Sequence, residues 1–159
     1  MKKIQIYFLL SIFFITNISY AFSIEPDIFI QSTVNRASKV LSNNISKEQK
    51  IDELKLIAKD TVFIEKVASY SLGSFRKTLT NKQKIKYLFL FEKYFLKSFS
   101  SRLSEWTNPH IDVISKKFIN ENYSMVSSVL KGTSERPEVK IDWRVYTKNS
   151  ENPLIVDVV

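Results

Sequence analysis

The spacing of apolar residues predicts helices in the first two thirds of the chain and strands in the last third. Apolar residues recur every three or four positions from Pro26 to about Leu41, and again after Ser46, which is the period of an amphipathic helix. A third such segment is predicted to open at Asp60 and to stop at Gly73, because glycine is favoured just past a helix end. Each segment has an apolar face that must pack on a neighbouring layer.

The longest predicted helix is rich in aromatic residues. Thr80 and Gln83 have the spacing of a capping box, so the helix is predicted to begin near Asn81 and to run to about Trp106. Its apolar residues cover well more than the roughly 100° that a surface helix buries. Two explanations stay open: a central helix packed on two sides, or a helix whose rings face a cavity. One line of this helix carries Leu88, Phe91, Phe95, Phe99 and Trp106.

After Pro109 the apolar period shortens to two. Val139 to Val145 alternates cleanly, with Val139, Ile141, Trp143 and Val145 on one face, as expected for a strand with one buried side. Helices followed by an antiparallel meander predict an α+β fold in which the helices pack on one sheet face. Further strands are predicted at 111–113, 126–129 and 154–159, with turns at 131–137 and 148–153.

Composition narrows the function. The chain has 159 residues, enough for one domain with a real core, and a formal net charge of +8. A positive net charge of this size favours binding to nucleic acid or to an anionic membrane. The lysines, however, are scattered along the sequence as on an ordinary solvated surface. The aromatic residues follow a helix face and not an exposed strand, which disfavours single-strand nucleic-acid binding. With no cysteine and a single histidine, His110, we expect no disulfide and no metal site.

The carboxylates do not indicate an enzyme. No two of them form a spaced pair within a recognisable motif, and the alternation places Asp142 on the polar face of its strand. The chain also contains no G-x-S-x-G, phosphate-binding loop or H-E-x-x-H motif. We therefore expect no catalytic residues. The carboxylates considered are Glu65, Glu92, Glu105, Asp112 and Asp142.

The N-terminus has the pattern of a secretory signal peptide. Lys2 and Lys3 precede an apolar run, and Ser19-Tyr20-Ala21 supplies small residues at the spacing that signal peptidase requires. A membrane anchor would need roughly 20 apolar residues, more than this run contains. The prediction is therefore a signal peptide at residues 1–21, followed by a single exported domain at residues 22–159.

Several segments together resemble one family. Leu72-Gly73, Phe75-Arg76, the T-x-x-Q box and the F-x-x-x-F run follow one another from Val67 to Trp106. The stretches RPEVKIDWRV at 136–145 and VDVV at 156–159 follow in order. In this order they resemble the MlaC family of periplasmic phospholipid-binding proteins, also called the toluene-tolerance family. The resemblance covers roughly residues 24–159. Family members usually carry an aromatic residue where this chain has 153–155, and they continue past the last strand, whereas this sequence ends at Val159. The domain is therefore expected to lack the family's C-terminal segment, as a fragment, a frameshifted product or a shortened variant.

The resemblance implies a soluble, monomeric phospholipid carrier. A curved sheet and a helical layer would enclose an apolar pocket for the acyl chains, which are cargo and not a cofactor. The carrier would move lipid across the periplasm between an outer-membrane lipoprotein complex and an inner-membrane ABC transporter, which maintains outer-membrane lipid asymmetry. The alternative is an exported structural or protein-interaction domain without lipid transfer. The candidate lipid-binding residues are Leu72, Phe75, Phe91, Phe95, Phe99, Trp106, Val139, Ile141, Trp143 and Val145.

Overall fold

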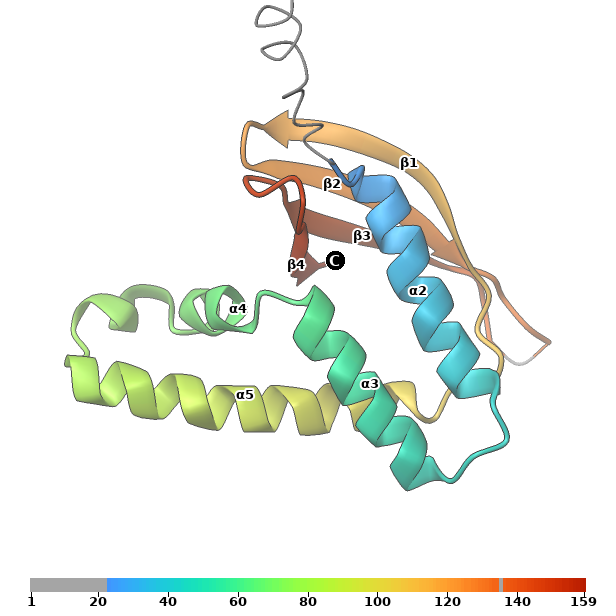
Figure 1. The fold of residues 1–159 in the computed structure, drawn as a ribbon, viewed down its shortest axis with the longest axis horizontal. Helices are drawn as coiled ribbons and strands as arrows, with labels where there is room; N and C mark the ends of the chain where they lie inside the picture. Colours follow the sequence, from blue (N-terminus) through green and yellow to red (C-terminus); the bar gives the residue numbers. More distant parts are fainter. Residues whose placement is uncertain (1–22, 135) are drawn as a thin grey trace, which may run out of the picture.

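In the described part of the chain, four α-helices are followed by a four-stranded antiparallel sheet, which confirms the predicted α+β class (Figure 1). The computed structural model describes residues 23–134 and 136–159. The signal peptide predicted at residues 1–21 lies outside them. The helices are α2 (Pro26–Ser42), α3 (Lys47–Thr61), α4 (Ile64–Ser71) and α5 (Asn81–Leu103), with a short 3-10 helix η1 (Gly73–Lys77). The strands are β1 (Ile111–Asn120), β2 (Tyr123–Leu130), β3 (Val139–Tyr146) and β4 (Leu154–Val158).

The predicted helix starts at Ser46 and Thr80 are confirmed. Each side chain accepts a hydrogen bond from the backbone N–H three residues on, and the backbone N–H of the cap residue donates to the side-chain oxygen of the glutamine at that position. These capping boxes satisfy amides that would otherwise lack a partner at the helix start. Gly73 ends α4 as predicted, with φ at +54°, in the left-handed region that favours glycine.

The predicted start of the third helix at Asp60 was wrong, because α3 continues through Thr61 and α4 begins at Ile64. The break between them is set by the sheet. Val62 forms a parallel bridge to Ile155, and the Phe63 N–H donates to the Ile155 carbonyl at 2.8 Å. Because Val62 and Ile155 are far apart in sequence, their pairing leaves no periodic pattern from which the helix break could be predicted.

The predicted end of the long helix near Trp106 was also wrong. α5 ends at Leu103, and only a last turn continues, in which the Trp106 N–H donates to the Leu103 carbonyl at 3.0 Å. Asn108 then takes a positive φ of 48° ahead of Pro109, which stops helical propagation. Trp106 therefore lies beyond the aromatic line of α5. Its ring instead stacks under the Arg136 guanidinium, 4.4 Å away.

The sheet is a simple meander, with neighbouring strands in the order β1-β2-β3-β4. Extra residues shift the register after Val113 and Phe118 in β1 and between Arg144 and Val145 on the β3–β4 pair. Such bulges bend a strand and increase its twist, and the sheet arches over the helices (Figure 1). The predicted buried face of β3 is confirmed at the end of the strand, where Val145 is buried and Trp143 packs against the core, whereas Val139 at its start is 42% exposed.

The main core lies where α2 crosses this face of the sheet. Its fully buried members are Ile30, Val34, Val126, Val145 and Ile155. Burial of five such side chains provides the dominant stabilisation of this layer, at about 1.5–3 kcal/mol each.

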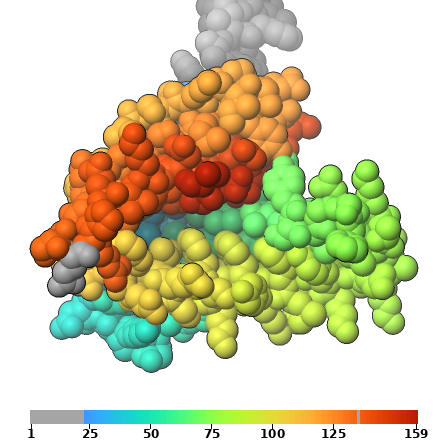
Figure 2. Space-filling model, turned by 180° about the vertical axis from the view of Figure 1, so that it is seen from behind, coloured from blue at the N-terminus to red at the C-terminus, as the bar shows by residue number. Residues whose placement is uncertain are grey.

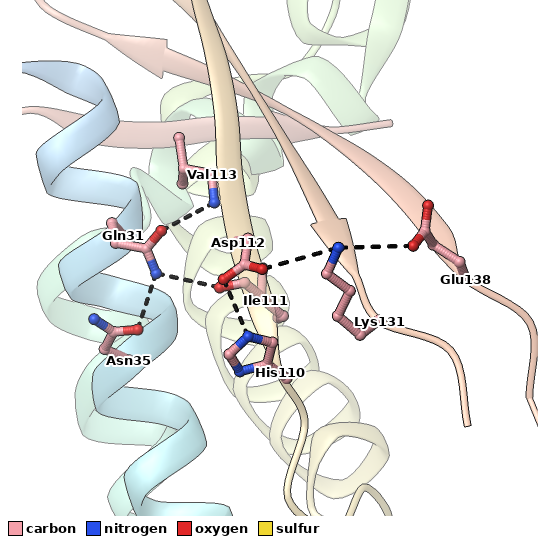
Figure 3. A network of polar contacts seen from close by, with 8 residues as sticks. All are labelled: Gln31, Asn35, His110, Ile111, Asp112, Val113, Lys131 and Glu138. Atoms are coloured by element: carbon pink, nitrogen blue, oxygen red, sulfur yellow. Dashed lines mark hydrogen bonds and ion pairs between the residues drawn. The ribbon is translucent and has the colours of Figure 1, made fainter. Parts of the chain in front are cut away.

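A single glutamine fastens α2 to the edge strand β1. The Gln31 amide nitrogen donates to the Ile111 carbonyl at 3.2 Å, and its oxygen accepts from the Val113 N–H at 2.9 Å (Figure 3). The same nitrogen donates to Asn35 at 2.9 Å. Gln31 thereby pairs backbone groups that an edge strand would otherwise leave open.

A chain of ion pairs links the ends of the strands. Lys131 at the end of β2 pairs with Asp112 in β1 and with Glu138 just before β3 (Figure 3).

The second layer is formed by α3, α4 and α5. α5 packs mainly on α3 and α4, burying Leu54, Ile57 and Leu96, and the sheet lies above it in Figure 1. Among the described helices, none combines the length and the hydropathy that a membrane crossing requires.

Candidate functional site

The space between the two layers is the candidate site. Seen from behind, the molecule is hollowed between β4 and α5, and atoms of the first helices lie at the back of the hollow (Figure 2). A cleft of about 880 Å³ lies where the end of α3, α4, α5 and the start of β4 meet. This volume falls within the range of small-molecule sites, about 300–1,000 Å³.

The cleft has an apolar lining with charged residues among it. Lys59 and Glu92 form an ion pair from α3 to α5 at 3.5 Å. Such a lining suits a ligand with an apolar body and a polar end. The apolar residues of the lining are Val62, Phe63, Ile64, Ala68, Leu88, Phe89 and Leu154, and the polar ones are Lys59, Asp60, Glu65, Glu92 and Asn152.

A row of aromatic rings runs along α5. The rings of Phe91 and Phe95 stack with centroids 6.1 Å apart, those of Phe95 and Phe99 at 5.4 Å, and Tyr87 joins the end of the row at 5.8 Å from Phe91. All four side chains are half-buried. They repeat every four residues and so share one side of the helix, next to the buried Leu96. We call Tyr87, Phe91, Phe95 and Phe99 the aromatic row.

A lysine surrounded by aromatic rings borders the cleft. The Lys66 ammonium lies 3.9 Å from the ring centroid of Tyr146, 5.0 Å from that of Tyr123 and 5.6 Å from that of Phe63. Tyr70 completes the cluster, with its hydroxyl 3.3 Å from the Tyr123 hydroxyl. Such cation–π contacts are worth about 0.5–2 kcal/mol. The cluster holds α4 to β2 and β3.

Charge and burial compete in this cluster. Burial works to lower the pKa of Lys66, but its interactions with the Tyr123 phenol and then with Tyr70 and Tyr146 together outweigh burial, so the pKa of Lys66 lies above its ordinary value. In return, Lys66 first and Tyr70 second lower the pKa of Tyr123. The lysine is therefore held in its charged form beside the cleft.

Among the described residues, no group of three or more histidine, aspartate and glutamate side chains is arranged to hold a metal ion.

Sequence comparison decides the family. The sequence model of the family described as MlaC protein matches residues 31–159, which is most of the chain. The chain belongs to the MlaC family. None of the curated proteins matches the sequence.

The MlaC assignment agrees with the fold. Among solved structures, the chain is similar to a phospholipid-binding protein from Ralstonia solanacearum, determined in complex with a phospholipid, with a TM-score of 0.69 and 11% sequence identity. The likeness covers 85% of this chain and 77% of that chain. At this identity the similarity establishes a shared fold.

The ten lipid-binding residues predicted for this MlaC family member fall in three places. Phe91, Phe95 and Phe99 form the aromatic row. The four β3 residues share one sheet face, where Val145 is fully buried and the Trp143 indole N–H donates to the Ser128 hydroxyl at 2.8 Å. Three residues lie apart from both groups: Leu72 at the end of α4, Phe75 in η1 with 71% of its surface exposed, and Trp106 after α5.

None of these ten residues belongs to the lining of the cleft, and their contact with lipid stays a prediction. Sequence reasoning did not assign the cleft residues to the lipid site, because they come from α3, α4, α5, β4 and the connections before α4 and β4 and share no periodicity. It also missed the Lys66 cluster. The available signal was the tyrosine at the start of β2 and the tyrosine at the end of β3, which the hairpin places opposite each other.

Proposed function

We propose that this protein is a periplasmic phospholipid carrier that shuttles lipid between outer-membrane and inner-membrane complexes of an ABC-type transport system. Membership of the MlaC family over residues 31–159 carries the proposal. The shared fold with a protein that holds a phospholipid supports it. The carrier forms no covalent bond with its cargo and needs no catalytic residue.

Hydrophobic burial is the physical basis of such a carrier. Each CH₂ group of an acyl chain withdrawn from water stabilises the complex by about 0.8 kcal/mol. The protein must therefore offer apolar surface that its own core does not use. The aromatic row, which stays half-buried in the described structure, and the apolar cleft lining are the surfaces that we assign to the acyl chains. The head group would remain near the charged residues Lys59 and Glu92.

Vesicle-to-vesicle transfer tests the carrier function. Purified protein is added to donor vesicles containing a fluorescent phospholipid and to acceptor vesicles that quench it. Transfer should rise in proportion to protein concentration, and heat-denatured protein should give only the background rate. A rate equal to background at all concentrations would favour the alternative, an exported protein-interaction domain without lipid transfer.

Export is tested separately. The sequence predicts cleavage after Ala21, so N-terminal sequencing of protein from the periplasmic fraction should begin at Phe22. Recovery of the protein from the cytoplasm with Met1 and Lys2 still present would contradict the proposed location.

A further inference from the structure

The helix α5 leaves large apolar side chains in water. Ile85 is 69% exposed, Phe89 57%, Leu90 52% and Tyr94 71%. At about 100° per residue, Ile85 and Tyr94 point to opposite sides of the helix, whereas Phe89 and Leu90 lie about 100° apart, close enough to meet one flat surface. The aromatic row lies outside the arc from Phe89 to Leu90. Exposed apolar side chains on a helix that also has a packed side contribute to interaction sites.

The arc between Phe89 and Leu90 is strongly cationic. Four exposed lysines lie within it, and the Lys93 ammonium sits 4.2 Å over the Phe89 ring. Glu92 is the single acidic residue of α5, and it is paired with Lys59. We call this surface the docking face. It comprises Phe89 and Leu90 together with Lys82, Lys86, Lys93 and Lys97.

We infer that the docking face binds the surface of a phospholipid bilayer that contains anionic lipid. A helix side that interleaves aromatic and aliphatic residues with lysines suits the boundary between acyl chains and head groups. Lysines can extend to anionic head groups while their stems lie on apolar surface. Of the alternatives, a second copy of this chain would place like-charged docking faces against each other.

The position of the docking face links it to the cleft. Phe89 belongs to the docking face and also lines the cleft, so a docked molecule would hold the cleft beside the bilayer. This inference goes beyond the proposed carrier function, because that function does not require membrane binding. A carrier could exchange lipid with partner proteins alone, without touching a bilayer.

Vesicle sedimentation tests the inference with the full chain. The protein should sediment with vesicles of mixed phosphatidylglycerol and phosphatidylcholine, but not with pure phosphatidylcholine vesicles. Binding should weaken as salt is raised, because salt screens exposed charges. Each lysine close to an anionic surface strengthens binding about fivefold, so the double variant Lys86→Gln, Lys93→Gln should bind about 25-fold more weakly.

Matched variants test whether vesicle binding depends on the docking face itself or only on the net charge and the exposed apolar surface of the protein. Lys140→Gln with Lys148→Gln removes the same charge from exposed sites on β3 and the following turn, and should leave binding within about twofold of wild type. Leu90→Ser should weaken binding, whereas Phe118→Ser on β1, where the side chain is 70% exposed, should not.

Several results would overturn the inference: no binding to anionic vesicles, equal binding to neutral ones, or equal weakening by both pairs of lysine variants. Sedimentation of the protein alone as a dimer that Leu90→Ser dissociates, without vesicle binding, would assign the face to a second copy. Phospholipid extracted from the same preparations reports the carrier function independently. Vesicle binding by protein that never carries phospholipid would refute the carrier and support docking.

Discussion

Replacing Phe95 by glutamate tests whether the aromatic row contacts lipid. Phe95 is the centre of the row and stacks on Phe91 and Phe99. Losing two ring contacts lowers the free energy of unfolding by about 0.5–1.5 kcal/mol each beyond area burial, whether or not lipid is bound. A carboxylate among acyl chains weakens lipid binding by several kcal/mol unless it stays protonated. A binding loss of about 3 kcal/mol corresponds to more than a hundredfold loss of lipid affinity.

Phe118→Glu is the matched control. It makes the same substitution on β1, where Phe118 is 70% exposed and lies outside the row, the cleft lining and the docking face. Both variants are purified, checked for helix content by circular dichroism, and extracted for phospholipid. We expect Phe95→Glu to be depleted of lipid and Phe118→Glu to hold as much as wild type. If folded Phe95→Glu retains the full complement, the row does not line the lipid site. Should Phe95→Glu fail to fold, Phe95→Ser answers the same question without adding charge.

Three further predictions concern the scaffold. Gln31→Leu leaves the Val113 N–H and the Ile111 carbonyl without their partner and should lower the free energy of unfolding by about 1–3 kcal/mol in urea titration; an unchanged midpoint would contradict this role. Gly73→Ala meets no atom within 4 Å but must keep a φ of +54°, so it should cost about 1 kcal/mol, and a neutral result would show that the backbone relaxes. The hydrogen bond from Lys116 lowers the pKa of Asp27 below its ordinary 3.8, so its stabilising effect is present above that value and lost as pH falls through the folded pKa. Melting temperatures of wild type and Asp27→Asn should therefore differ at neutral pH, begin to converge only below pH 3.8, and meet once the pH has fallen through the lower folded pKa; a gap that persists below that pH would refute the linkage.

Local signals allowed most elements to be predicted. The capping boxes at Ser46 and Thr80 act over three residues, and the alternation in β3 reports directly which side of a strand is buried. The end of α3 and the start of α4 could not be predicted in the same way. They depend on Ile155, which pairs with Val62 across more than half of the chain.

The same distinction applies to the candidate site. The aromatic row was predictable, because rings four residues apart on a helix must be neighbours. The cleft was not, because Lys59, Glu92 and Leu154 come together only when the helical layer folds under the sheet. Trp106 shows what periodicity cannot predict. Its spacing placed it in line with the rings of α5, but the helix ends three residues earlier, at Leu103.

Native mass spectrometry of the protein purified from the periplasm tests the central claim most directly. The carrier account predicts a major species heavier than the polypeptide by the mass of a diacyl phospholipid, which collisional activation releases and which lipid extraction identifies. Phe95→Glu should show mainly the bare polypeptide. A wild-type protein that appears only as the bare polypeptide, and that takes up no phospholipid after incubation with vesicles, would contradict the account.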